Sequence, residues 1–181
     1  REDEAGLYWI EAMKGQGVDD SVFRASSVDN TATVSASPRF AAWMNRETVG
    51  TNTERIFLSF HSNGSSDGLA NDRGTLGLYN GNNYPESVTP HMFDWANLAG
   101  KEVNDDLVAM GTKLEFPWVN NPNPTLDRAD IEFGEINNLY INNEFDATIC
   151  EVAYHDNVTD AQLMRDPKVR ARAAKHGIVD A

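Results

Sequence analysis

The order of apolar and polar residues predicts strands that alternate with helices. Residues 55–60, residues 74–79 and the run around Ile149 are short, apolar and rich in β-forming residues, which is typical of buried strands. Apolar residues at three- and four-residue steps predict helices at 5–14 and over a longer segment that ends at Gly111. Strands separated by helices favour a three-layer α/β fold with a mainly parallel central sheet.

Capping and turn residues predict where the shorter elements start. The polar residues 26–35 are predicted to form a loop. Ser37 and Pro38 then fit an N-cap followed by a proline at the first helical position. Towards the end of the chain, Thr159 fits a capping box, and Asp166 fits an N-cap followed directly by a proline. Two helices are therefore predicted to close the chain.

Residues 112–145 break this alternation, because they are rich in asparagine, proline and acidic residues. We interpret them as an atypical insertion that shapes a substrate groove. The insertion would lie within one domain spanning residues 1–181, since a chain of 181 residues that is 40% hydrophobic suits a single core. The predicted helix at 5–14 follows no strand, so we expect an N-terminal portion of the natural domain to precede Arg1.

The charge and the cysteine content narrow the classes of partner and location. The formal net charge is −13, and no basic run occurs before the last helix, so binding to nucleic acid phosphates is not expected. No stretch approaches the ~18 consecutive apolar residues of a membrane span, so none is predicted. The lone Cys150 rules out an internal disulfide and fits either the cytosol or a bacterial exterior.

Two titratable side chains stand out on the predicted strands. His61 follows residues 55–60, and open α/β sheets bind ligands beyond the carboxyl ends of their strands. Glu151 lies among apolar neighbours, where an uncompensated carboxylate costs about 1–3 kcal/mol or more. Zinc binds neutral imidazole and carboxylate, so His61 is a candidate zinc ligand and Glu151 a candidate ligand or general base. The alternative is a structural Glu151, compensated by Arg39 or by a helix N-terminus.

Four other side chains are weaker candidates. Glu135 is a second acidic candidate, although a loop carboxylate is commonly solvated. His91 is expected at the surface or as a cap partner in the first turn of a helix. His155 follows the last strand, where a structural or substrate-facing role is favoured over metal binding. Cys150 beside His155 suggests a cysteine hydrolase, but alternation points Cys150 and Glu151 to opposite faces, which favours a packing role for the cysteine.

Several of these strings, taken in order, resemble a known family. Residues 59–63 read Ser-Phe-His-Ser-Asn and residues 151–157 read Glu-Val-Ala-Tyr-His-Asp-Asn, followed by a leucine and an arginine-bearing helix at 163–170. Residues 22–24 and 37–42 look like the strand with a trailing arginine and the arginine-bearing helix that come earlier in the family. The chain resembles the zinc-dependent N-acetylmuramoyl-L-alanine amidases over nearly its whole length.

The resemblance implies a bacterial enzyme, secreted or in the cell envelope, whose substrate is peptidoglycan. Such enzymes hydrolyse the amide between the lactyl group of N-acetylmuramic acid and the L-alanine of the stem peptide. The family binds Zn²⁺ with His, Glu and His, and His61 matches the downstream histidine. Glu2, five residues before Leu7, matches the glutamate ligand, with Glu4 as its rival. Glu151 matches the catalytic glutamate, which handles protons while zinc polarises the scissile carbonyl.

One part of the family pattern has no counterpart in this sequence. The family's first zinc histidine lies in a turn like Asp-Pro-Gly-His-Gly-Gly, whereas the histidines present are His61, His91, His155 and His176. Either that histidine belongs to a portion that precedes Arg1, or the site has lost zinc binding. The alternative function is therefore a catalytically inactive amidase-like module that binds the cell wall or has a structural role.

Overall fold

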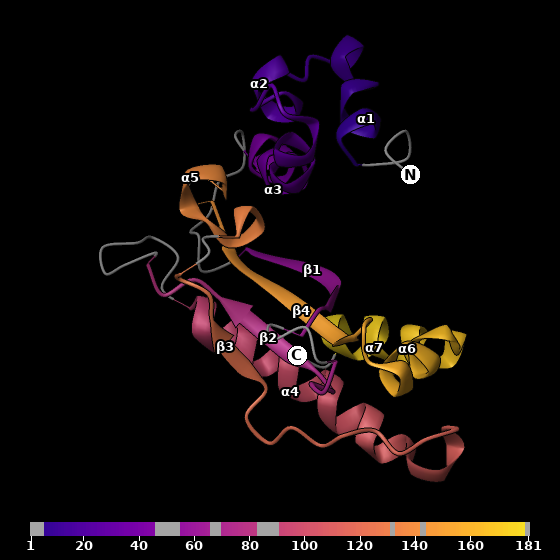
Figure 1. The fold of residues 1–181 in the computed structure, drawn as a ribbon. Coiled ribbons are helices and arrows are strands. Elements are labelled where there is room, and N and C mark those ends of the chain that lie inside the picture. The colour runs from indigo at the N-terminus through magenta and orange to yellow at the C-terminus, as the bar shows by residue number, and fades with distance from the viewer. Residues whose placement is uncertain are drawn as a thin grey trace. The chain divides into compact units, whose positions relative to one another are not determined.

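The structure is a computed structural model that describes residues 6–45, 55–65, 70–82, 91–130, 133–141 and 144–179 (Figure 1). These residues pack into two compact units, each with a hydrophobic core of its own. The helical unit takes its described residues from Arg1–Phe57, Asn80–His91 and Ala129–Ala147. The sheet unit takes its described residues from Leu58–Tyr79, Met92–Arg128 and Thr148–Ala181.

Four strands form one sheet in the order β1-β4-β2-β3. The strands are β1 (Ile56–Asn63), β2 (Leu76–Tyr79), β3 (Thr125–Asp127) and β4 (Asp146–Tyr154). β2 pairs in parallel with β3 and antiparallel with β4. β1 runs parallel to β4, because Asp146 N–H donates to Arg55 O (3.2 Å) at one end and His155 N–H donates to Asn63 O (2.9 Å) at the other. The predicted α/β class with a mainly parallel sheet is confirmed.

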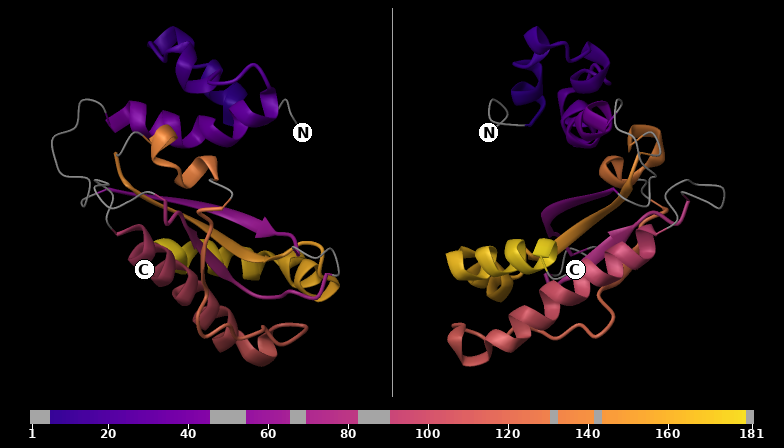
Figure 2. Two further views of the ribbon diagram at one scale, coloured as in Figure 1. Left: turned by 60° about the vertical axis from the view of Figure 1, so that its left-hand side comes forward. Right: turned by 180° about the vertical axis from the view of Figure 1, so that it is seen from behind.

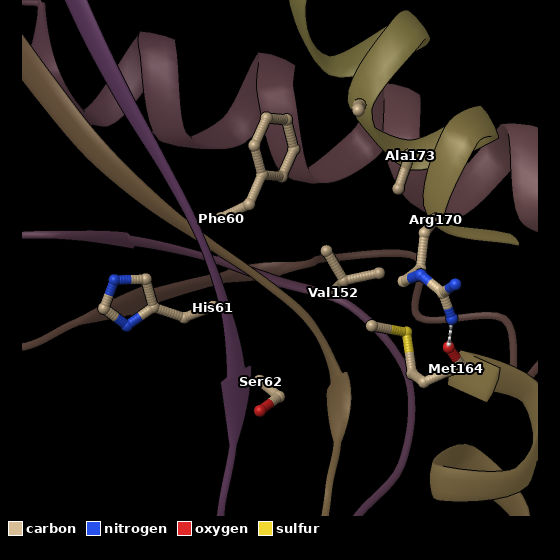
Figure 3. A pocket seen from close by; sticks show the side chains of 8 residues that line it. Phe60, His61, Ser62, Val152, Met164, Arg170 and Ala173 are labelled. Carbon is tan, nitrogen blue, oxygen red and sulfur yellow. Dashed lines mark hydrogen bonds between the residues drawn. The ribbon is translucent and has the colours of Figure 1, made fainter. Parts of the chain in front are cut away.

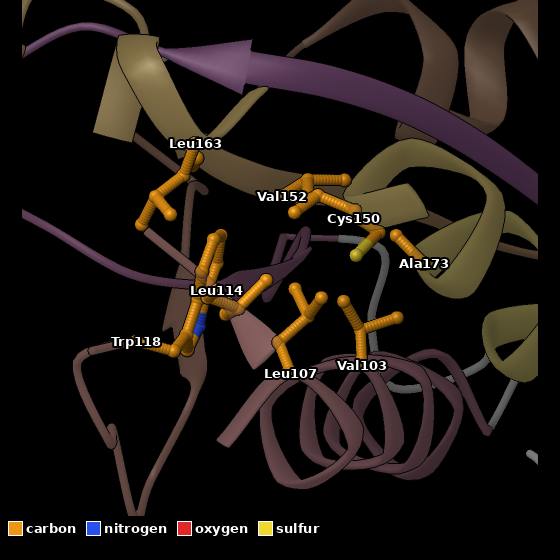
Figure 4. Packing of buried hydrophobic residues seen from close by; sticks show 10 residues of the cluster. Val103, Leu107, Leu114, Trp118, Cys150, Val152, Leu163 and Ala173 are labelled. Atoms are coloured by element: carbon orange, nitrogen blue, oxygen red, sulfur yellow. The ribbon is translucent and has the colours of Figure 1, made fainter. Parts of the chain in front are cut away.

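Three helices of the sheet unit cover the face to which Cys150 and Val152 point. They are α4 (Met92–Met110), α6 (Val158–Arg165) and α7 (Pro167–Val179). α4 packs against β2, β3 and α7, and α6 packs against α7 (Figures 1 and 2). Val103, Leu107 and Leu163 meet the strand residues in the core (Figure 4). Cys150 and Val152 are 0% and 4% exposed, so this face of β4 is a packing surface.

Residues 112–145, the predicted insertion, divide between the two units. They contain most of η4 (Gly111–Lys113), all of β3, η5 (Gly134–Ile136) and α5 (Asn138–Ile141). The buried Asn104 of α4 holds the part before β3, because its Oδ1 accepts from Asn121 N–H (2.9 Å) and its Nδ2 donates to Asn120 Oδ1 (2.9 Å). Asn121 Nδ2 also donates to Thr75 O (3.2 Å), just before β2. The asparagines of this stretch therefore tie it to the sheet unit.

The helical unit contains α1 (Gly6–Glu11), η2 (Lys14–Gln16), α2 (Asp20–Phe23) and α3 (Asp29–Asn45), together with η5 and α5. Its core joins Leu7 of α1 to small residues of α3 such as Ala32. Arg24 follows α2 and forms ion pairs with Asp29 (2.7 Å) and Glu11 (3.2 Å). One guanidinium group thus connects the ends of three helices.

Three sequence predictions for this unit are wrong. Residues 22 and 23, likened to a strand, belong to α2, and residues 29–35, predicted as loop, form the first half of α3. Pro38 therefore lies inside α3 and does not start it. The reason is that α3 buries small residues, including Ala32 and Ala36, so its core face looks polar or neutral in the sequence. Packing against α1 and α2 outweighs the backbone hydrogen bond that proline cannot donate.

The start of α6 also differs from the prediction. Asn157 is the N-cap, because its Oδ1 accepts from Thr159 N–H (3.0 Å) and Asp160 N–H (3.2 Å). The capping box predicted at Thr159 is therefore two residues late, since asparagine supplies the same kind of acceptor earlier in the chain. The N-cap predicted at Asp166 is confirmed, because its carboxylate accepts from Lys168 N–H (2.8 Å).

Candidate functional site

Glu151 lies near the carboxyl end of β4, a strand whose nine residues are all buried. Because Cys150 and Val152 point to the helices, the Glu151 side chain projects from the opposite face of the sheet. Glu151 is 5% exposed, and Leu76 is its register partner on β2. β4 is also paired on both sides, by β1 and by β2. The fold therefore holds this carboxylate rigidly, in a largely dehydrated position.

Cys150 is unsuited to act as a nucleophile. The residue is 0% exposed, and burial, with a smaller contribution from the Glu151 carboxylate, raises the pKa of the thiol to about 12. The nucleophilic form is the thiolate, and this thiol remains protonated at neutral pH. Cys150 packs as a small hydrophobic residue in the core of the sheet unit, which excludes the cysteine hydrolase interpretation.

His61 lies within β1 and not beyond its end, because the strand continues for two more residues. Among the described strands β1 is at the edge of the sheet, and His61 is exposed. The imidazole lies on the opposite side of β1 from Phe60, Val152 and Arg170 (Figure 3). Since Glu151 also points away from Val152, His61 and Glu151 project from the same face of the sheet. The structure thus brings these two predicted site residues to one face.

The other face of β1 borders a cavity of about 490 Å³ between this strand, α6 and α7 (Figure 3). Phe60, Val152, Met164 and Ala173 give it an apolar lining. Arg170 lines it as well, but its Nη1 donates to main-chain oxygens at the end of α6. His61 and Ser62 of the edge strand line this cavity too, so it borders His61, whereas Glu151 is not one of its described lining residues.

The segments that follow β1 and β4 are tied together. His155 Nδ1 lies 3.1 Å from Ser62 O and 3.3 Å from Ser62 Oγ. Asp156 accepts from Ser65 N–H (2.8 Å), and this hydrogen bond lowers the pKa of Asp156. These contacts give both residues a structural part at the carboxyl ends of the two strands, which agrees with the structural role considered for His155.

Asp160 organises the same end of the sheet, a role that the sequence did not indicate. Its carboxylate is 1% exposed and accepts from Arg73 Nε (2.8 Å), Gly74 N–H (2.7 Å) and Tyr154 N–H (3.3 Å). These bonds join the start of β2, the end of β4 and the first turn of α6. In the sequence, Asp160 is an acidic residue in the first turn of a helix, which is too common a pattern to mark a site.

Tyr154 closes β4 in the same acidic surroundings. Burial, followed by the nearby Asp72 carboxylate, raises the pKa of Tyr154, so the phenol stays protonated at neutral pH. The Asn63 side chain acts against this rise in the pKa, whereas the Glu151 and Asp156 carboxylates add to it. A protonated phenol therefore lies at the end of β4, near enough to Glu151 for that carboxylate to contribute to the raised pKa of Tyr154.

The candidate zinc ligands fall only partly within the described structure. Glu2 and its rival Glu4 lie outside the described residues. Among the residues that the structure describes, no group of three His, Cys, Asp or Glu side chains is placed to hold a metal ion. A catalytic zinc needs three protein ligands. The described donors therefore do not fit zinc by themselves, and His61 supplies a single exposed imidazole.

The remaining candidates belong to the helical unit, whereas Glu151 belongs to the sheet unit. Glu135 lies in η5 and is partly exposed. His91 donates its backbone N–H to Asp146 Oδ1 (3.0 Å). Arg39, considered above as the compensating charge for Glu151, lies over an aromatic ring of α5, 4.6 Å from its centroid. The contacts of His91 and Arg39 thus lie within the helical unit.

Comparison with known proteins identifies the fold. No family model and no curated protein matches the sequence. Seven chains of solved structures match. One is the CwlD amidase from Clostridioides difficile, solved in complex with the GerS lipoprotein; the TM-score is 0.53 at 13% identity, over 96% of this chain and 81% of that chain. Another is the N-acetylmuramyl-L-alanine amidase Ami1 from Mycobacterium smegmatis; the TM-score is 0.52 at 20% identity, over 96% and 74%. The chain thus has an amidase-like fold.

Proposed function

We propose that this chain is a peptidoglycan hydrolase that cleaves the amide between N-acetylmuramic acid and L-alanine. The observation that carries the proposal is the buried Glu151, held on a central strand of an amidase-like fold and directed away from the covering helices. The motif resemblance of residues 59–63 and 151–157 supports the same chemistry from the sequence.

Glu151 is the proposed general base and acid. Its carboxylate takes a proton from the attacking water and passes it to the nitrogen of the departing amine. A carboxylate on a strand that is paired on both sides has little positional freedom, so the proton transfer needs little reorganisation.

The proposed cofactor is Zn²⁺, with His61 and Glu2 as two of its ligands. Bound zinc would polarise the scissile carbonyl. Because the described donors do not form a set of three, we assign no step of the reaction to the metal. Zinc binding is instead a separate prediction, measured as metal content of the order of one zinc per chain for a catalytic site.

The proposed location is the cell envelope or the exterior, where the peptidoglycan substrate lies. None of the described helices is both long and apolar enough to cross a membrane. The net charge of −13 argues against nucleic acid as a partner, because phosphate contacts need a local basic surface. Peptidoglycan is therefore the proposed macromolecular partner.

Replacement of Glu151 by glutamine tests the proposal. We expect the wild-type protein, supplied with zinc, to release stem peptides with a free L-alanine amino group from purified peptidoglycan. Glu151→Gln should reduce this rate by about 10²- to 10⁴-fold, the range for loss of a general acid–base group. Glu135→Gln changes a partly exposed carboxylate of the helical unit and is the matched control.

Full activity of the Glu151→Gln protein would contradict the proposal. Sedimentation of the wild-type protein with peptidoglycan, without release of stem peptides at any zinc concentration, would instead support the inactive wall-binding module. Metal analysis of the same samples, on wild type and His61→Ala, tests the zinc prediction independently of turnover.

A further inference from the structure

The helical unit contains a cavity of about 230 Å³ that the proposed hydrolysis does not use. It lies between α2, α3 and α5, and its polar lining consists of Ser21, Arg39, Tyr140 and Glu144. Trp43 adds an aromatic wall and stacks on Phe40. Pockets for drug-sized ligands have volumes of about 300–1,000 Å³, so this cavity suits a smaller group, such as one end of a ligand.

Arg39 has an unusual position in this cavity. Its guanidinium lies over the Tyr140 ring, 4.6 Å from the centroid. Within the described part of the chain, Arg39 Nε is buried without a hydrogen-bond partner, and no carboxylate pairs with the group. A buried donor without an acceptor is costly, because it has lost its hydration and gained no bond in return. An external acceptor at this point would remove that cost.

The neighbouring charges explain why Arg39 is available. Glu144, on the cavity wall, is directed to Arg55, with 3.2 Å between Nη1 and Oε2. Arg24, in the same unit, is by contrast paired with two carboxylates, those of Asp29 and Glu11. Arg39 differs from Arg24 and Arg55 of the same unit, because its guanidinium lies over an aromatic ring and not against a carboxylate.

The chemistry of the lining selects the ligand. A guanidinium fork matches the two oxygens of a carboxylate in a bidentate pair. Glu144 nearby disfavours a doubly charged group such as phosphate, because like charges repel. Trp43 and Tyr140 provide apolar surface for an aliphatic group next to the carboxylate. We propose that this cavity binds the terminal carboxylate of a short peptide through Arg39. The proposal is independent of the hydrolytic function.

Titration with small peptide-end analogues tests the site. The probes are N-acetyl-D-alanine, N-acetyl-L-alanine and the corresponding neutral amides. Binding is followed through the NMR signal of the Trp43 indole N–H in a ¹⁵N-labelled protein. The Trp43→Phe variant, which lacks this signal, assigns it. We expect saturable shifts with the acids and at least about tenfold weaker binding of the amides, the factor that corresponds to 1.4 kcal/mol. Tighter binding of the D form would indicate the end of a cell-wall peptide, and tighter binding of the L form would indicate the end of an ordinary polypeptide.

Variants separate the role of Arg39 from general charge effects. Arg39→Gln should abolish binding of the acids, whereas Arg24→Gln, which alters an already paired arginine, should retain it. Arg39→Lys keeps the charge but lacks the fork, so it should bind several-fold more weakly. Equal binding of acid and amide by the wild-type protein would overturn the proposal without any variant. So would retained binding by a folded Arg39→Gln protein, or tighter binding of inorganic phosphate than of the acids.

Discussion

The strands β1 and β4 are neighbours in one sheet, yet they differ sharply in burial. All nine residues of β4 are buried, whereas Ile56 and Phe60 of β1 are 61% and 36% exposed. Each strand carries one candidate site residue, Glu151 on β4 and His61 on β1. The two residues therefore reach the same face under different constraints. The carboxylate is fixed and dehydrated by a central strand, while the imidazole stays accessible on the edge strand of the described sheet.

The largest expected loss of stability comes from removing the support at the end of β4. Asp160→Ala should lower the free energy of unfolding by about 3 kcal/mol, because it leaves Arg73, which is only 24% exposed, and two backbone donors without their acceptor. Urea unfolding measures the change. Asp105→Ala, which breaks an exposed pair with Lys101, is the control and should cost less than about 0.5 kcal/mol. A loss for Asp160→Ala as small as that for Asp105→Ala would show that the Asp160 network does not stabilise the fold.

A smaller effect separates the interiors of the two strands. Cys150→Ser on β4 should cost about 1–3 kcal/mol, because the new hydroxyl is buried among apolar groups. Ser62→Ala on β1 should change the free energy of unfolding by less than about 0.5 kcal/mol, since Ser62 is exposed. Both values come from chemical denaturation. A cost at Ser62 as large as that at Cys150 would break the contrast between the strands.

The buried thiol also predicts how stability depends on pH. Its pKa rises from an ordinary value of 9.0 to about 12 in the folded protein, mainly through burial. This stabilising contribution is complete below pH 9 and is lost as the pH rises towards 12, by up to about 1.4 kcal/mol per pH unit. Denaturation of wild type and Cys150→Ala at pH 8 and pH 10 should therefore show the wild-type advantage shrinking at the higher pH. A wild-type advantage that grows from pH 8 to pH 10 would contradict the raised pKa of the buried Cys150 thiol.

The smallest expected change in stability is at His61. His61→Ala should leave the free energy of unfolding within about 0.5 kcal/mol of wild type, because the side chain is exposed on the edge strand. Bound zinc and amide hydrolysis should nevertheless fall, if the imidazole is a ligand as proposed. Thermal unfolding of metal-free protein, combined with metal analysis, checks both parts. A large loss of stability in the metal-free protein would assign His61 a structural role instead.

The sequence predicted the sheet better than the helical unit, for a physical reason. The strands around Phe57, Leu78 and Ile149, and the long helix with Val103 and Leu107, bury large apolar residues whose spacing is visible in the sequence. The first half of α3 buries alanine and serine, which give no such signal. β3 is only three residues long, too short for a strand pattern.

The candidate site could be predicted only in part. Alternation and the apolar neighbours correctly predicted a packing role for Cys150, which lies in the core of the sheet unit. The position of His61 within β1 was missed, since the polar residues at 61–63 suggested that the strand had ended. The network at Asp160 joins residues up to 87 positions apart in the sequence, so no local pattern indicates it. Glu2 lies outside the described residues and stays a prediction.

The strand directions have a consequence for how new specificities can be engineered. Since β2 and β3 run opposite to β4, residues 117–124 enter β3 at the end of the sheet where β4 terminates, and Arg73 Nη2 contacts Pro117 O (3.4 Å) there. The segment that leaves β3 exits at the far end. A randomised library confined to residues 119, 122 and 123, with Asn120 and Asn121 retained, would therefore vary the surface next to the carboxyl end of β4. It would also keep the buried Asn104 as a fixed anchor for the loop.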